Sequence, residues 1–238
     1  MLPPVSGERS AIVLVHGAWH GSWCWDRVVP LLESHDLSVH LVDLPSIGAD
    51  PDDPSALSGD AAAVSRLLDD ASGPFLVCGH SYGGMVVTHA TAGRKDVARL
   101  VYLCAFMPDA GESLLSLTGG PAPWIREQDD GRMLPDLALA AETFYGDCDP
   151  EIQRASIERL RPMPPAPFAE AVPQAAWREI ASTYIVCTED KAIDPAAQRA
   201  WAARTPHVIE APFDHSPGVS HPDAVADILA GIACAPSS

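Results

Sequence analysis

The chain has 238 residues, 47% of them hydrophobic, and a formal net charge of -17 at pH 7. This length suits one large α/β domain with a buried core, with or without an inserted lid. The strong negative charge argues against nucleic acid and against anionic membrane surfaces, so we expect neither as a partner.

Targeting and redox signals indicate a cytoplasmic protein. Residues 1–10 are polar and lack the apolar region of a secretory signal, and no apolar run approaches the length of a membrane span. The cysteines form no C-x-x-C pair, and several fall in strand-like apolar runs, which favours buried free thiols over disulfides or a metal site. They are Cys24, Cys78, Cys104, Cys148, Cys187 and Cys234.

Short apolar runs alternate with helical patterns along most of the chain. The runs predict six strands at 11–15, 38–42, 75–78, 100–104, 183–187 and 207–210. The intervening patterns predict helices at 25–34, 61–70, 83–92, 195–204 and 222–232. Strands and helices that alternate at this spacing indicate an α/β fold, with a mostly parallel sheet of about six strands covered on both faces.

The pattern changes between residues 110 and 178, where Gly, Pro and scattered aromatic residues predominate. Only short helices are predicted there, at 137–144 and 151–160, and the Pro-rich segment 161–167 should be neither helix nor central strand. We interpret 110–178 as a helical lid inserted into a core formed by 1–109 and 179–238. Its candidate roof residues are Trp124, Phe144, Tyr145, Met163, Phe168 and Trp177.

A G-x-S-x-G motif, residues 79–83, joins the third predicted strand to a helix. In this context the turn projects Ser81 above the sheet, and side chains at Gly79 and Gly83 would clash where strand and helix nearly touch. In parallel sheets ligands bind at the carboxyl ends of the strands, where Ser81 lies. We therefore predict Ser81 as a nucleophile; the alternative is an ordinary helix N-cap.

A serine nucleophile needs a histidine base and a carboxylate to orient it, and this fold places them in the order Ser, Asp or Glu, His. Asp190 follows the strand at 183–187 and is the predicted acid. Its rivals are Glu189 and Asp194, but Asp194 precedes Pro195 at a helix start and is better explained as an N-cap.

The predicted base is His215, in the loop after the last strand. His207 begins a strand and His221 lies at a helix start, so both have structural explanations. Asp214 directly precedes His215 in the sequence, so its carboxylate cannot orient the His215 ring well and should pack locally. His80, next to the nucleophile on the turn, cannot approach the Ser81 hydroxyl productively.

Two backbone N–H groups should stabilise the oxyanion of the transition state. Tyr82 N–H lies at the helix start after Ser81, and Ala18 N–H lies in the loop after the first strand. His16 and His20 in that loop could be interpreted as a metal pair, but no third ligand accompanies them. A loop-fixing role is favoured, and we expect no metal and no cofactor.

Five segments resemble the α/β-hydrolase branch that contains plant methylesterases and hydroxynitrile lyases. They are HGAWHGSWCW (16–25), GHSYGGM (79–85), AFMPD (105–109), IVCTEDK (185–191) and DHS (214–216). The resemblance covers the core from Ile12 onward, whereas the lid matches weakly. It implies Ser81, His215 and Asp190 as a triad, Ala18 and Tyr82 as oxyanion donors, and esters of small, often aromatic or cyclic carboxylic acids as substrates.

Two positions depart from the lyases. One class of lyase carries threonine at position 17 and lysine at position 216, and the other carries asparagine at position 17; this chain has Gly17 and Ser216. The chain therefore resembles a hydrolase, and Ser81 argues against the aspartate-dependent dehalogenases and epoxide hydrolases. We expect a pocket formed by Gly17, Trp19, His20, Phe106, Trp124, Phe144, Tyr145, Met163, Phe168 and Ser216.

The predicted function is that of a serine carboxylesterase acting on a small-molecule substrate. One alternative keeps the triad but opens lactones, hydrolyses C–C bonds or cleaves cyanohydrins. A second is a non-catalytic ligand receptor on a hydrolase scaffold. The sequence leaves the physiological substrate and the oligomeric state open, a homodimer included.

Overall fold

The computed structural model describes residues 11–49 and 56–235, and six strands in it form one sheet. The strands are β1 (Ala11–Val15), β2 (Val39–Val42), β3 (Phe75–His80), β4 (Val97–Leu103), β7 (Ser182–Cys187) and β8 (His207–Ala211). Their order is β2-β1-β3-β4-β7-β8, and every neighbouring pair is parallel. The predicted α/β fold with a parallel sheet of about six strands is confirmed.

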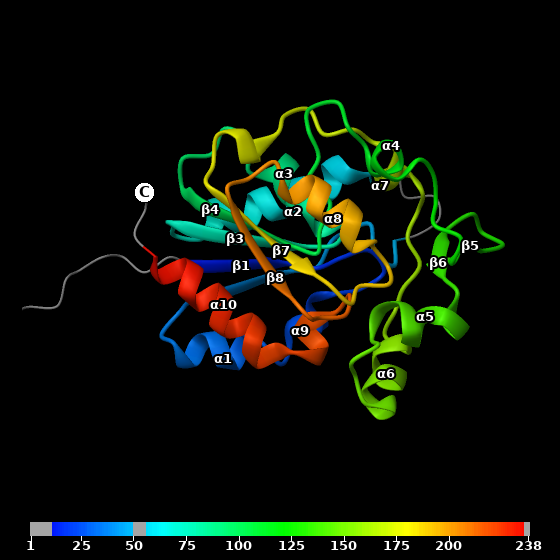
Figure 1. The fold of residues 1–238 in the computed structure, drawn as a ribbon. Helices are drawn as coiled ribbons and strands as arrows, with labels where there is room; N and C mark the ends of the chain where they lie inside the picture. The colour runs from blue at the N-terminus through cyan, green and yellow to red at the C-terminus, as the bar shows by residue number, and fades with distance from the viewer. Residues whose placement is uncertain (1–10, 50–55, 236–238) are drawn as a thin grey trace, which may run out of the picture.

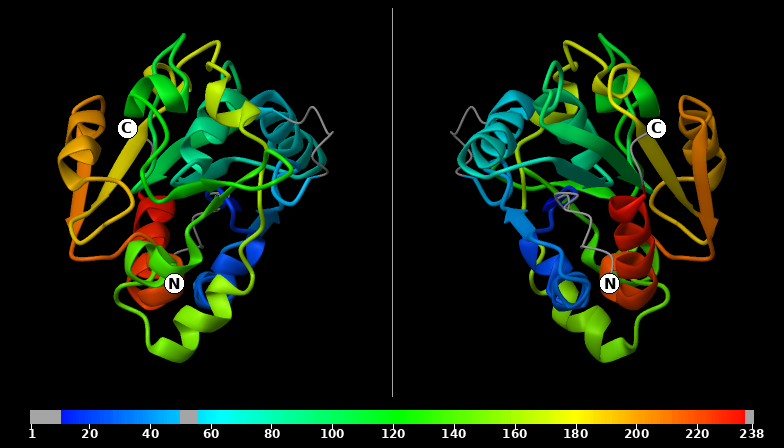
Figure 2. Two further views of the ribbon diagram at one scale, coloured as in Figure 1. Left: turned by 90° about the vertical axis from the view of Figure 1, so that its right-hand side faces the viewer. Right: turned by 90° about the vertical axis from the view of Figure 1, so that its left-hand side faces the viewer.

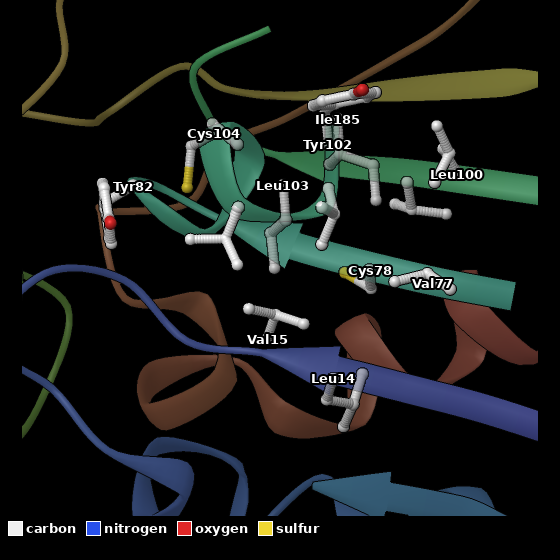
Figure 3. Packing of buried hydrophobic residues seen from close by; sticks show 14 of the residues in the cluster. Leu14, Val15, Val77, Cys78, Tyr82, Leu100, Tyr102, Leu103, Cys104 and Ile185 are labelled. Carbon is white, nitrogen blue, oxygen red and sulfur yellow. The ribbon is translucent and has the colours of Figure 1, made fainter. Parts of the chain in front are cut away.

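Helices cover both faces of this sheet (Figure 1; Figure 2). On one face lie α1 (Val29–Ser34), α9 (Pro217–Ser220) and α10 (Pro222–Cys234). On the other lie α2 (Leu57–Asp70), α3 (Gly83–Ala90) and α8 (Pro195–Ala202). Because both faces are covered, β1, β3 and β7 are buried at every position, and β1 is a continuous apolar run. Side chains of the central strands pack against one another in Figure 3.

Most of the segment 110–178, called the lid segment below, lies at the carboxyl end of the strands, and its last residues return toward the start of β7 (Figure 1). Its elements are α4 (Leu114–Thr118), β5 (Ile125–Glu127), β6 (Met133–Pro135), α5 (Leu137–Phe144), α6 (Pro150–Ile157), α7 (Ala166–Ala169) and a 3-10 turn (Ala176–Arg178). Four of these elements are α-helices, and the antiparallel pair β5–β6 is an addition that the sequence did not predict. Gly131, with φ of 79°, lies in the turn that joins these strands.

Three predictions about helices need correction. The predicted helix 25–34 is a 3-10 turn (Ser22–Trp25) followed by α1, because Pro30 has no N–H to continue a helix begun at Trp25. Helix α2 begins at Leu57 rather than at residue 61. The predicted non-helical segment 161–167 overlaps the start of α7, where Pro167 occupies a first-turn position that needs no N–H donor.

All six cysteines lie in the described part of the chain as free thiols, and only Cys234 is exposed. Across residues 11–49 and 56–235, every helix is too short or too polar to cross a lipid bilayer.

Candidate active site

Ser81 lies in the sharp turn between β3 and α3. Its φ of 54° is in the left-handed region, which is strained for a serine. The surrounding backbone holds this conformation: Ser81 N donates to Leu103 O at 3.2 Å, and Ser81 O accepts from Gly84 N at 3.0 Å and Phe106 N at 3.1 Å. A Cβ at Gly79 would lie 2.6 Å from Gly83 O, so the predicted need for glycine there is confirmed.

The structure brings Ser81, His215 and Asp190 together from three loops distant in sequence. His215 Nε2 is 3.0 Å from Ser81 Oγ, and His215 Nδ1 is 2.8 Å from Asp190 Oδ2. All three residues are buried. A carboxylate accepts the Nδ1 proton, which leaves the Nε2 lone pair facing the Ser81 hydroxyl. This is the protonation pattern that a general base requires.

Asp190 is held by several donors besides His215. Its Oδ1 accepts from Ala192 N at 2.8 Å and Ile193 N at 2.9 Å, and its Oδ2 accepts from Gln198 Nε2 at 2.8 Å. Gln198 was not predicted from the sequence. Its signal is its place on the helix face that also carries Trp201 and Ala202, since a glutamine on the buried face of a helix needs polar partners.

His80 fixes the loop that carries His215. A carbonyl oxygen can only accept, so His80 Nε2–H donates to His215 O across 2.7 Å. Burial lowers the pKa of His80 well below its usual value, so this ring beside His215 is neutral. His80, Cys104 and His215 have potential ligand atoms within 4.8 Å of one another, but a metal ion there would compete with the contacts of the triad.

The rival acids and bases have structural contacts. Asp194 caps α8 by accepting from Ala196 N at 2.8 Å. Asp214 exchanges hydrogen bonds with Asp147 of the lid segment: each carboxylate accepts from the backbone N–H of the other residue at 3.0 Å. His221 Nε2 is 2.8 Å from Asp147 Oδ2. These contacts join the lid segment to the loop that carries His215.

The predicted oxyanion donors, Ala18 N–H and Tyr82 N–H, belong to residues that line the same cavity as Ser81. Within the described part of the chain, neither N–H has a protein acceptor at hydrogen-bond distance. Gly17 lies directly behind the nucleophile: a Cβ at this position would be 2.8 Å from Ser81 Cβ. The backbone here therefore has no room for a side chain at position 17.

His16 and His20 hold the loop that carries Ala18. His16 Nδ1–H donates to Gly17 O at 2.9 Å while its Nε2 accepts from Leu44 N at 3.1 Å. His20 Nδ1–H donates to Ala18 O at 2.8 Å, and its Nε2 accepts from Tyr145 Oη of the lid segment at 2.8 Å. Burial lowers the pKa of His20 to about 3 and also lowers that of His16, so both rings are neutral. These contacts are those of loop-fixing residues.

The cavity above Ser81 has a volume of about 590 Å³ including its mouth, and carbon atoms dominate its walls. Of the predicted pocket residues, Trp19, Phe106, Trp124 and Phe168 line it. The lining side chains that the sequence analysis missed are Leu114, Leu115, Thr118, Pro121, Ala122, Ile125, Met133, Ala192 and Ile193. Most come from α4 and the β5–β6 pair, for which the short, weakly periodic sequence gave no clear signal.

Six predicted pocket residues are not among those that line this cavity: Gly17, His20, Phe144, Tyr145, Met163 and Ser216. Phe144 and Tyr145 form a layer behind it, where the Phe144 ring lies 5.6 Å from the His215 ring. The backbone of Met163 pairs with that of Met133, and Met133 rather than Met163 lines the cavity. Ser216 Oγ is buried beside Trp25 and His80. Trp177, a further roof candidate, donates from Nε1 to Pro108 O at 2.7 Å.

Comparisons with known proteins agree with this architecture. The model of the alpha/beta hydrolase family matches residues 12–228, so the chain belongs to this family of hydrolytic enzymes. A pyrethroid hydrolase from Sphingobium wenxiniae is 31% identical over 249 residues, covering 95% of this chain and 88% of that protein. Salicylic acid-binding protein 2 of Nicotiana tabacum is 29% identical over 219 residues, covering 81% and 84%.

A solved structure gives the same result. The crystal structure of a pyrethroid hydrolase from Sphingobium faniae superposes with a TM-score of 0.83 at 28% identity, covering 95% of this chain and 98% of that one. The likeness extends across both the parallel core and the lid segment. The fold prediction and the resemblance to the methylesterase-like branch of the family are therefore confirmed.

Proposed function

We propose that this chain is a serine carboxylesterase that hydrolyses esters of small aromatic or cyclic carboxylic acids through an acyl-enzyme on Ser81. The observation that carries the proposal is the Ser81–His215–Asp190 chain of hydrogen bonds, at 3.0 and 2.8 Å, at the base of an apolar cavity. The similarity to the pyrethroid hydrolases supports hydrolysis, and the name of the tobacco relative supports an aromatic acid.

The proposed reaction begins when His215 Nε2 takes the proton from Ser81 Oγ as this oxygen attacks the ester carbonyl. Negative charge develops on the carbonyl oxygen and is stabilised by Ala18 N–H and Tyr82 N–H, and one well-aimed donor of this kind is worth roughly 3 kcal/mol. His215 returns the proton to the departing alcohol, which leaves the acyl group on Ser81. A water molecule, deprotonated by His215, then releases the acid and regenerates the serine.

The cavity walls support a neutral, apolar substrate. Among the described residues that line the cavity none is Asp, Glu, Lys or Arg, and the hydroxyl and imidazole groups of the lining belong to Ser81, Tyr82, Thr118 and His215. A charged substrate group would lose its hydration without gaining a partner. Gly17 favours ester hydrolysis over cyanohydrin cleavage, because the lyases that resemble this chain carry a side chain at that position and the backbone here leaves no space for one.

Labelling and turnover test this proposal together. A fluorophosphonate probe should label the parent protein at Ser81, and p-nitrophenyl acetate should be hydrolysed. Ser81→Ala should lose both while its circular dichroism and melting temperature stay those of the parent. Parent-level turnover in Ser81→Ala would contradict the assignment. A well-folded parent that neither reacts with the probe nor hydrolyses esters would favour the ligand-receptor alternative, and product analysis on lactones and mandelonitrile addresses the other reactions.

Two further proposals concern the protein as a whole. We infer a cytoplasmic location from the six free thiols, which persist in a reducing compartment. A homodimer is proposed as a second oligomeric state beside the monomer, and light scattering on the purified protein distinguishes the two.

A further inference from the structure

Tyr82 combines two positions that bear on the proposed reaction. Its backbone N–H is a predicted oxyanion donor. Tyr82 also lines the cavity next to Phe168, and the centroids of the two rings lie 6.0 Å apart. The side chain lies beyond the carboxyl end of β3 (Figure 3) and is fully buried. Its hydroxyl does not face an open polar surface; it donates to Asp60 Oδ2 at 2.7 Å.

Asp60 is an unusual partner because it is itself fully buried. Its Oδ1 accepts from Ser46 N at 2.9 Å, and its Oδ2 accepts from Ser46 Oγ at 2.7 Å as well as from Tyr82. In the described part of the chain no Lys, Arg or His forms an ion pair with it. Burial raises the pKa of the Asp60 carboxyl, which shows that the site disfavours the charge.

Such a pair is costly for packing alone. A phenylalanine or leucine at position 82 and an apolar residue at position 60 would fill the same space without a buried carboxyl group. The hydrogen bonds that Asp60 accepts from Ser46 and Tyr82 instead fix the far end of the Tyr82 side chain. The structure thus retains a directional restraint where an apolar contact would suffice for stability.

The backbone next to Tyr82 explains why a restraint is useful. The Tyr82 N–H belongs to the peptide that follows Ser81, and the φ of 54° at Ser81 is strained for a serine. Strained conformations persist only where the surroundings hold them from several sides. The Tyr82 hydroxyl at Asp60 and the Tyr82 ring against Phe168 restrain residue 82 from its side chain, and with it the direction of its N–H.

Asp60 lies in the first turn of α2, and this turn also contacts the lid segment. Ser58 N and Ser58 Oγ donate to Glu170 Oε2 at 3.0 and 3.3 Å, and Glu170 directly follows the short helix that carries Phe168. One turn of α2 therefore holds Tyr82 through Asp60 and the helix of Phe168 through Ser58. Tyr82 and Phe168, which both line the cavity, are therefore anchored to the same helical turn.

We propose that Asp60, supported by Ser46, is a positioning residue for the oxyanion hole: by holding the Tyr82 hydroxyl it keeps the Tyr82 N–H aimed at the developing oxyanion. This inference rests on the proposed function. Tyr82→Phe keeps the ring and removes the anchor. Asp60→Asn keeps the volume and one oxygen acceptor but replaces the carboxylate. Tyr102→Phe is the matched control, because Tyr102 is also a buried tyrosine whose hydroxyl is paired, at 2.8 Å from Thr88 Oγ1, but it does not line the cavity.

The test measures kcat and KM for p-nitrophenyl acetate per active site, counted with a fluorophosphonate. It also measures inhibition by a trifluoromethyl ketone, which forms an oxyanion on Ser81, and by a neutral amide analogue, which does not. Tyr82→Phe and Asp60→Asn should each lower kcat about tenfold with KM within about twofold, because a misaimed donor costs less than the 10²–10³ of a removed one. The ketone should lose affinity by the same factor while the amide does not.

The double variant should lose no more than either single variant, because both changes break one unit. Tyr102→Phe should keep the parent kcat. Variants that melt at a lower temperature but keep parent kcat per labelled site would overturn the inference and leave a purely structural pair. Failure of the parent to react with the probe or hydrolyse the ester would instead refute the proposed function, so the two failures are distinct.

Discussion

The triad and the cavity roof are held by different kinds of interaction. The triad lies at the ends of buried parallel strands, and its residues have buried hydrogen-bond partners, such as Gln198 for the Asp190 carboxylate and His80 for the backbone carbonyl of His215. The lid segment is joined to the core partly by exposed ion pairs, such as that of Glu142 with Lys191 at 3.0 Å. Buried networks resist displacement, whereas exposed pairs contribute little.

This difference separates chemistry from selectivity in the molecule. Changes in the buried network should remove catalysis or the fold itself. Changes in the lid segment should alter which substrates are accepted, at a smaller cost in stability.

The largest effect should come from Asp190→Asn. The asparagine amide is neutral, so it lacks the negative charge with which Asp190 accepts the hydrogen bond from His215 Nδ1–H. It also favours the wrong tautomer of the ring, and kcat should therefore fall by about 10⁴. Assays of p-nitrophenyl acetate hydrolysis by the purified variant measure this loss, and circular dichroism is the control for folding. A loss below tenfold would show that Asp190 is not the acid of the triad.

Gly79→Ala should prevent correct folding of the nucleophile turn. The new Cβ would lie 2.6 Å from Gly83 O, a backbone atom that cannot move without displacing α3. We expect a loss of more than about 4 kcal/mol in the free energy of unfolding, or no soluble protein. Urea denaturation measures it, and Gly93→Ala is a useful comparison because no atom lies within 4 Å of its Cβ, although its φ of 74° adds some strain.

Trp124→Ala in the lid segment should change selectivity. The ring lines the cavity and contacts Trp19 edge-on, with centroids 5.6 Å apart. The value of kcat/KM for an aromatic ester should fall by roughly 10- to 200-fold, while that for p-nitrophenyl acetate should change much less, because the smaller acyl group does not reach the roof. Equal losses for both substrates would indicate that the lid segment supports the chemistry as well as the selectivity.

Glu112→Gln should have the smallest effect, and one that depends on pH. Arg204 hydrogen-bonds to Glu112 and holds the pKa of this carboxyl below its ordinary value of 4.5. Because the folded pKa is lowered, the stabilisation is present above pH 4.5 and is lost as the pH falls through the folded value. The variant should be less stable than the parent at pH 7 by under about 1 kcal/mol, and the difference should shrink at acid pH.

Thermal melts of parent and variant between pH 7 and pH 3 test this sign. Lys191→Ala provides the comparison, since its pair with Glu142 is exposed on both sides and its loss should shift the melting temperature little. A difference between parent and Glu112→Gln that grows toward acid pH would contradict the assignment.

The sequence by itself determined the parallel core and the positions of the triad candidates along it. β-Branched runs identify strands because branched side chains suit an extended backbone, and the parallel topology places the ends of those strands at one edge. The glycines of the nucleophile turn were also predictable, because their need follows from local sterics. The start of α2 and the β5–β6 pair were missed because short-range patterns are weak there.

Only the tertiary structure decided which side chains share a site. Gln198 meets Asp190, and Asp60 meets Tyr82, across loops whose closure no local pattern encodes. Met133 lines the cavity where Met163 was expected, because the two residues pair through their backbones and only one of them reaches the opening. Local sequence sets the conformation of each turn, but contacts between distant turns depend on how the whole core and lid segment pack.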